Sequence, residues 1–144
     1  MLKQLDNSDW CEAFGYAGEG GSWAGGAHVN PVPGSQAGNE PFTRADVTML
    51  LGLAEGDNDG PNWVCVGRLR DGRWFCLRAG CDNTGWSCSA TGDASVAGTA
   101  AELLRLGMSA DERARCRLHI DLTMLQGADD EYVEREIAAL ALQG

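Results

Sequence analysis

The chain of 144 residues is one domain by size, and a domain of this length buries a sizeable core without disulfides. Its 11 basic and 21 acidic side chains give a net charge of −10, which disfavours direct binding to nucleic acid and favours a basic partner surface. All apolar runs are far shorter than the roughly 20 residues of a membrane span, so we expect no membrane partner.

The distribution of charge along the chain and the expected cellular compartment follow from the sequence. Residues 1–60 carry a net charge of −7, residues 61–108 carry +1 and residues 109–144 carry −4. The first residues, Met1 to Asp6, lack the charged and apolar regions of a signal peptide, so we expect a cytoplasmic protein. In that compartment its six cysteines are expected to be reduced thiols.

The first third of the chain, residues 1–42, is predicted to hold one helix and a long loop. Ser8 is a candidate N-cap, and Trp10, Phe14 and Ala17 follow at helical spacing. The segment 18–41 is rich in glycine and proline and has almost no periodicity, so it is predicted to be a loop. A loop of this length within one domain is often functional.

Residues 43–90 are predicted to form the core of the fold. Val47, Leu50, Leu51 and Ala54 have helical spacing after the N-cap candidate Thr43, which predicts a helix over 44–54. Strand-forming residues 63–70 and 73–79 flank Asp71-Gly72, a strong hairpin signal, and a third strand is expected over 86–90.

A two-residue turn at Asp71-Gly72 fixes the expected register of this hairpin. It pairs Leu69 with Trp74 and Gly67 with Cys76. One face of the sheet is then expected to show Trp63, Cys65, Leu69, Trp74 and Cys76, and the other face Val64, Val66, Phe75 and Leu77. We expect helices to cover one face and part of the loop to cover the other.

The last part of the chain, residues 98–142, is predicted to be helical. A short helix is expected over 100–106, and the capping box Ser109-x-x-Glu112 begins another that runs to about Leu118. A final helix is expected over 129–142. The predicted fold is therefore a single α+β domain, a three-stranded antiparallel β-meander packed with about four to five short helices.

Chemistry-bearing residues are few. The single lysine, Lys3, rules out a Walker A loop and a Schiff-base lysine, and the two histidines, His28 and His119, do not form a His-Glu-x-x-His motif. We therefore predict a protein that is not an enzyme and that has no cofactor. Cys81 and Cys88 bracket a short turn and are weak metal-ligand candidates, because zinc sites usually contain Cys-x-x-Cys pairs.

Candidate partner contacts come from three groups of residues. Arg70 and Arg73 lie at the hairpin end, where two facing arginines require carboxylates from this chain or from a partner. The remaining candidates are the acidic turn residues Asp57 and Asp59 and the aromatic residues Trp23 and Trp86. Trp74 and Phe75, interleaved with arginines, offer an alternative surface for stacking single-stranded nucleic acid, which the acidic charge of the chain opposes.

The stretch Ala79-Gly-Cys-Asp-Asn-Thr-Gly-Trp-Ser-Cys-Ser89, together with Asp71-Gly-Arg-Trp74, resembles a family of small uncharacterised proteins from actinobacteria and their phages. The recurring core of that family reads approximately Ala-Gly-Cys-Asp-Tyr-Thr-Gly-Trp-Asp-Cys-Gln. This chain differs at Asn83, Ser87 and Ser89. The resemblance brings no activity, and it implies a compact accessory protein encoded by a phage or another mobile element.

Three functional hypotheses follow. The leading one is a non-enzymatic acidic interaction module that inhibits or modulates a host or defence protein, in the host cytoplasm if a phage encodes it. The first alternative is a virion or assembly component, with the Gly-rich loop ordering on contact with its neighbours. The second alternative is a metal-binding protein or enzyme that uses Cys81 and Cys88.

Overall fold

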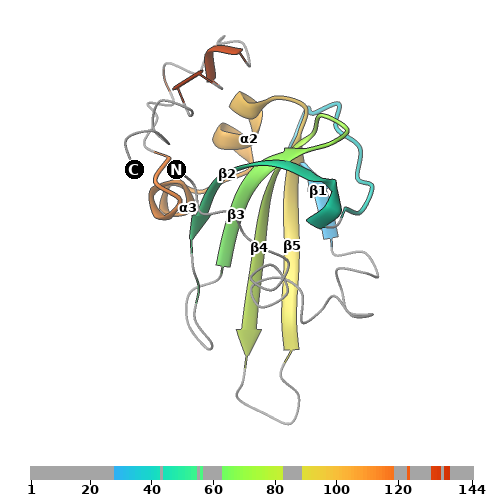
Figure 1. Cartoon of the computed structure of the whole chain (residues 1–144), viewed down its shortest axis with the longest axis vertical. Helices are drawn as coiled ribbons and strands as arrows, with labels where there is room; N and C mark the ends of the chain where they lie inside the picture. Colours follow the sequence, from blue (N-terminus) through green and yellow to red (C-terminus); the bar gives the residue numbers. More distant parts are fainter. Residues whose placement is uncertain are drawn as a thin grey trace.

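The computed structural model describes residues 28–42, 44–54, 56, 63–82, 89–118, 123, 131–133 and 135–136. Five strands form one sheet in the order β1-β5-β4-β3-β2 (Figure 1). Their bounds are β1 His28–Pro31, β2 Val47–Ala54, β3 Trp63–Leu69, β4 Trp74–Asp82 and β5 Ser89–Ala97. Strands β2 to β5 pair antiparallel, and β1 runs parallel to β5.

The α+β class is confirmed, whereas the predicted three-stranded meander is too small. Two of the five strands, β1 and β2, lie in segments that were predicted to be loop and helix. The third strand of the prediction, 86–90, overlaps β5 only at its start, since β5 continues to Ala97. The helix expected after Ser8 lies outside the described residues.

The predicted helix over 44–54 is wrong, and the spacing that suggested it comes from two bulges. The pairing of β2 with β3 slips by one residue between Val47 and Met49 and again between Leu50 and Gly52. Each bulge adds one residue to the two-residue period of a strand, so side chains three apart return to the same face. Val47, Leu50 and Leu53 therefore pack on one face of the sheet, with a spacing that resembles that of a helix.

The predicted register of the β3–β4 hairpin is wrong by one residue. Leu69 N–H donates to Arg73 O (2.8 Å) and Gly72 N–H donates to Leu69 O (3.0 Å), which closes a three-residue loop. Gly72 has φ +96, the left-handed conformation that such a loop needs at its third position. Val66 consequently faces Cys76, where Gly67 was expected.

A shift of one residue moves every side chain of β4 to the opposite face. Two core clusters result, one on each face of the sheet. The helix-side core contains Val64, Val66, Trp74 and Cys76 with Leu103, Leu104, Cys116, Leu118 and Val133. The opposite core contains Cys65, Leu69, Phe75, Leu77, Ala94 and Val96 with Phe42.

The two cores are covered by different parts of the chain. The helices α2 (Ala100–Leu106) and α3 (Ala110–Arg115) lie on one side of the sheet (Figure 1). On the other side, the segment before the 3-10 helix η2 (Arg44–Asp46) places Phe42 against Phe75, with ring centroids 5.0 Å apart. The expectation that helices cover one face is therefore confirmed.

Both predicted starts of helices in the described C-terminal part are confirmed. Thr99 caps α2, and the Ser109 capping box begins α3 with both reciprocal hydrogen bonds present. Helix α3 ends at Arg115, earlier than the predicted Leu118, because Arg117 takes a left-handed conformation (φ 60). Of the expected helix over 129–142, residues 131–133 and 135–136 are described, and they are helical.

No helix in the described segments combines the length and the apolar character that crossing a membrane would require.

Candidate functional site

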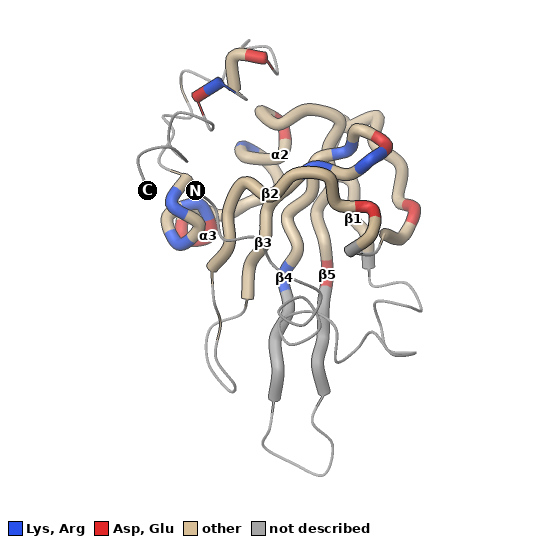
Figure 2. The backbone as a smooth tube through the Cα atoms, viewed as in Figure 1, with Lys and Arg blue, Asp and Glu red and all other residues tan. Residues whose placement is uncertain are grey.

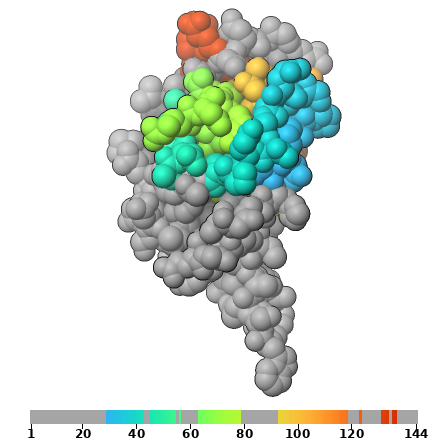
Figure 3. Space-filling model, turned by 90° about the vertical axis from the view of Figure 1, so that its right-hand side faces the viewer, coloured from blue at the N-terminus to red at the C-terminus, as the bar shows by residue number. Residues whose placement is uncertain are grey.

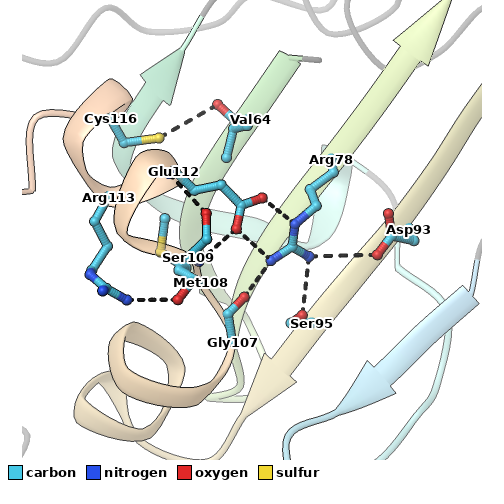
Figure 4. Close-up of polar contacts among 10 residues, drawn as sticks. All are labelled: Val64, Arg78, Asp93, Ser95, Gly107, Met108, Ser109, Glu112, Arg113 and Cys116. Atoms are coloured by element: carbon cyan, nitrogen blue, oxygen red, sulfur yellow. Dashed lines mark hydrogen bonds and ion pairs between the residues drawn. The ribbon is translucent and has the colours of Figure 1, made fainter. Parts of the chain in front are cut away.

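Arg78 on β4 connects the sheet to α3 and to the turn that precedes it (Figure 4). Its Nε donates to Glu112 Oε2, and its Nη2 donates to Glu112 Oε1 (3.0 Å) and to Gly107 O. Its Nη1 donates to Ser95 Oγ (3.1 Å) and lies 3.5 Å from Asp93 Oδ2. All three nitrogens of this guanidinium are therefore engaged within the chain, by four hydrogen bonds and the ion pair with Asp93.

The charges of this Arg78 cluster stabilise one another. Burial by itself raises the pKa of Glu112, but hydrogen bonds from Arg78 and Ser109 outweigh it and hold the pKa below its ordinary value. Burial likewise lowers the pKa of Arg78, and the Glu112 carboxylate reverses that shift, so the net direction is upward. Both groups are therefore ionised at neutral pH, and they form a partly buried ion pair.

Further bonds join α3 to its neighbours. Arg113 Nη1 donates to the carbonyl oxygens of Leu104 in the last turn of α2 (2.7 Å) and of Met108 in the turn after it (2.6 Å). Cys116 Sγ donates to Val64 O at 3.9 Å, which brings the end of α3 onto β3. These contacts fix the position of the helix pair on the sheet and involve no acid–base or nucleophile pair.

A second cluster surrounds Arg73, at the hairpin between β3 and β4. Arg73 Nε donates to Asp71 Oδ2 (2.8 Å), while Asp71 Oδ1 accepts the Arg73 backbone N–H (3.0 Å). Arg73 Nη1 donates to the carbonyl oxygens of Gly38 (3.1 Å) and Glu40 (2.8 Å). The Glu40 carboxylate lies 3.7 Å from Nη1. These bonds attach the hairpin to the segment that carries Phe42.

Arg70, the other arginine predicted at this end, has a different environment. Its side chain is exposed, and its Nη2 donates to Ala45 O at 3.1 Å. Its backbone N–H donates to Asp46 O at 2.7 Å, so the hairpin also contacts η2. Figure 3 shows the green atoms of the hairpin beside the blue-to-cyan atoms of the segment before η2.

The two predicted contact arginines are thus close in the fold but not equivalent. The predicted pairing of Arg70 with Arg73 does not occur, because the loop has three residues and Arg73 pairs with Leu69. The carboxylates expected at this end come, for Arg73, from Asp71 and Glu40 of the same chain. The aromatic residues considered for base stacking, Trp74 and Phe75, are fully buried and offer no exposed ring.

The other predicted site residues fall largely outside the described parts. Trp23, Asp57, Asp59, Trp86 and Cys88 are not among the described residues. The backbone of Cys81 is described, and it pairs with Ala90 across β4 and β5.

The described thiols are structural. Cys65, Cys76 and Cys116 are buried thiols that form no disulfide. Burial raises the pKa of Cys116 to about 12 and raises the pKa of Cys76 further still. The Cys76 and Cys116 thiols are therefore protonated at neutral pH and are poor nucleophiles. Within the described ranges, no group of three or more His, Cys, Asp or Glu residues has a geometry that could hold a metal ion.

Sequence reasoning missed Arg78 and Glu112 as partners. A signal for them existed, because Trp74, Cys76 and Arg78 alternate along one strand and therefore share a face. With the correct register that face is covered by helices, and a charge there requires an ionic partner on a helix.

Charge is unevenly divided between the described residues and the rest of the sequence. The described residues include ten arginines and ten acidic residues, and Figure 2 shows the two signs interspersed. The rest of the sequence carries Lys3 and eleven acidic residues, and hence the whole net charge of −10. These acidic residues are Asp6, Asp9, Glu12, Glu19, Glu55, Asp57, Asp59, Asp121, Asp129, Asp130 and Glu134.

Comparisons of the chain with protein-family models, with curated proteins and with solved structures found no match.

Proposed function

We propose that the protein is a non-enzymatic interaction module that binds a protein with a basic surface. The observation that carries this proposal is the division of charge. Arginines of the described sheet and helices bond mainly to acceptors of their own chain, as Arg73, Arg78 and Arg113 do. The surplus carboxylates belong to other segments of the sequence, which have only Lys3 to offset them.

An uncompensated negative charge accelerates encounter with a positively charged protein and favours it over neutral competitors. A basic groove that normally holds nucleic acid is one surface that such carboxylates fit. The resemblance of residues 79–89 to actinobacterial and actinophage proteins adds a setting to this proposal. In that setting the protein is an inhibitor or modulator, encoded by a phage or mobile element, of a host or defence protein.

The proposal is tested by affinity capture from lysate of the organism that carries the chain, with elution by stepwise increases in salt. We expect one partner at a stoichiometric amount, released between about 0.1 M and 0.5 M salt because screening shortens the range of the attraction. The partner is then purified, and its affinity for the protein is measured at two salt concentrations.

A pair of charge variants makes the test specific. Asp57→Asn with Asp59→Asn removes two of the surplus carboxylates, and Asp111→Asn with Glu136→Gln removes two exposed carboxylates of the described part. We expect the first pair to weaken binding at low salt by about tenfold and the second by less than about twofold. Equal losses from the two pairs, or no stoichiometric partner that salt releases, would contradict the proposal.

A further inference from the structure

Arg73 is a buried arginine whose guanidinium is only partly used. Its side chain is 9% exposed, and its Nε and Nη1 are held by Asp71 and by the carbonyl oxygens of Gly38 and Glu40. Its Nη2 group, with two N–H donors, has no acceptor among the described residues. Among the described residues, the side-chain polar atom that is fully buried without a partner is Trp74 Nε1, so Arg73 Nη2 reaches solvent and can donate to an acceptor of another molecule.

The bonds that Arg73 does make hold its open end in a fixed orientation. A guanidinium is planar, so fixing Nε and Nη1 also fixes the direction of the Nη2 donors. An arginine held in this way loses little conformational entropy when it binds an acceptor, unlike a free surface arginine. The position of Nη2 is therefore preorganised.

Arg70, in the same loop, adds a second cation. It is exposed, and within the described chain its guanidinium makes a single hydrogen bond, to a neutral carbonyl oxygen. Both carboxylate oxygens of Asp71 are already engaged by Arg73. The Glu40 carboxylate is 72% exposed and 3.7 Å from its nearest guanidinium nitrogen, so solvent screens its attraction.

From this geometry we propose that the β3–β4 hairpin end binds a carboxylate side chain of a peptide or protein partner, with Arg73 Nη2 as the donor and Arg70 as the supporting charge. The chemistry favours a carboxylate over a nucleic acid. Asp71 and Glu40 limit the positive potential that a run of phosphates requires, and the neighbouring Trp74 and Phe75 rings are buried and cannot stack on bases.

This site has the opposite sign to the acidic segments of the proposed function and stands independently of it. A partner that carries both basic and acidic patches would engage both, and such two-signed contact fixes the orientation of a complex. The carboxylate site can be tested without any partner in hand.

The test is an NMR titration of the full-length protein with a hexaglutamate peptide at low ionic strength, observing the arginine Nε–Hε signals. We expect the signals of Arg73 and Arg70 to shift together along a saturating curve, and that of Arg105, an exposed arginine on α2, to move little. Absence of a saturating shift at Arg73, or an equal shift at Arg105, would overturn the assignment.

Variants separate the two arginines. Arg70→Gln should weaken peptide binding about threefold, and the matched control Arg105→Gln should leave it within about 1.5-fold. Arg73→Lys keeps the charge but removes the planar fork, and it should weaken binding about tenfold. If Arg73→Lys does not fold, the wild-type titration and the Arg70→Gln and Arg105→Gln variants still test whether the hairpin end binds the carboxylate peptide.

A competing titration with a single-stranded oligonucleotide of six nucleotides addresses the other polyanion. We expect weaker binding than with hexaglutamate, and a stronger shift at Arg73 with the oligonucleotide would overturn the assignment to carboxylates. Failure of this site leaves the salt-sensitive partner of the proposed function intact, because that test depends on acidic residues elsewhere in the sequence.

Discussion

Arg78 and Arg73 are both largely removed from solvent, yet their partners within the chain differ. Arg78 makes hydrogen bonds within the chain through all three guanidinium nitrogens, and its chief partner, Glu112, is itself only 15% exposed. Arg73 is more deeply buried, but its charged partners Asp71 and Glu40 are exposed and its Nη2 is open. The comparison shows that two buried arginines can differ in how much of the guanidinium is bonded within the chain. The number of donors used and the burial of the partners distinguish the two.

The largest expected effect is that of Arg78→Met. The substitution leaves the Glu112 carboxylate partly buried without its cation, which in other proteins costs about 3 to 5 kcal/mol. We expect a loss of about 3 kcal/mol in the free energy of unfolding, measured by urea denaturation, because the Glu112 side chain keeps some solvent access. Arg105→Met, on an exposed arginine, is the matched control and should change stability by less than about 0.5 kcal/mol.

A second substitution shows whether the unpaired charge causes that loss. In Arg78→Met with Glu112→Leu both charges are absent, so the desolvation cost of the carboxylate disappears and part of the stability should return. A double variant that is as unstable as the sum of the two single variants would show that the two side chains act independently. That result would contradict the prediction that Arg78 stabilises the fold through its ion pair with Glu112.

Arg73→Met should cost less than Arg78→Met, about 1 to 2 kcal/mol in the free energy of unfolding. The substitution leaves the carbonyl oxygens of Gly38 and Glu40 without this donor, but the charged partners, the carboxylates of Asp71 and Glu40, are already exposed to water and can be solvated again. Urea denaturation of the two variants side by side gives the comparison directly. A larger loss of stability from Arg73→Met than from Arg78→Met would contradict the prediction that the Arg78 cluster contributes more to the free energy of unfolding.

The sequence predicted the class of fold and the starts of two helices, because these depend on local chemistry. The Ser109 capping box acts within one turn of helix and was confirmed, and the start of α2 was confirmed although its cap, Thr99, was not predicted. The register of the hairpin and the nature of β2 depend on contacts with other strands. Asp71-Gly72 fits a two-residue or a three-residue loop, and only packing decides which of them forms.

The predicted helix over 44–54, most of which is strand β2 in the structure, has a physical explanation. Two bulges in β2 bring side chains three residues apart back to the same face, a spacing close to that of a helix. Gly67 on β3 lies opposite Leu50, between the two bulges. A Cβ at Gly67 would lie 2.3 Å from Met49 O, so the close approach of the strands needs glycine there. The prediction of Arg70 and Arg73 at the hairpin end came from sequence, whereas the Arg78–Glu112 pair required the correct register.

The pH dependence of stability gives a smaller and separate test of the Arg78 cluster. The pKa of Glu112 is held below its ordinary value of 4.5, so its contribution to stability is present above that value and is lost as the pH falls through the lowered pKa of the folded state. We expect the stability difference between wild type and Glu112→Gln to be constant near neutral pH and to narrow below about pH 4.5. Thermal unfolding over pH 2.5–7 measures this, with Glu136→Gln as a control for the loss of one exposed carboxylate. A difference that does not change with pH would show that Arg78 does not favour the ionised carboxylate.

The smallest expected effect concerns Arg117, an arginine outside both clusters. It follows α3 with φ 60, and the bonds from Arg117 N–H to Ala114 O (3.0 Å) and from Leu118 N–H to Arg113 O (2.8 Å) form a Schellman motif. Glycine adopts this conformation without the cost that a Cβ imposes, although it also gives the unfolded chain more freedom. Because the Arg117 side chain is exposed, Arg117→Gly should raise the free energy of unfolding by about 0.5 kcal/mol in urea denaturation, whereas Arg117→Ala should not raise it. A loss of stability in the glycine variant would contradict this prediction, because it would mean that the exposed Arg117 side chain makes stabilising contacts.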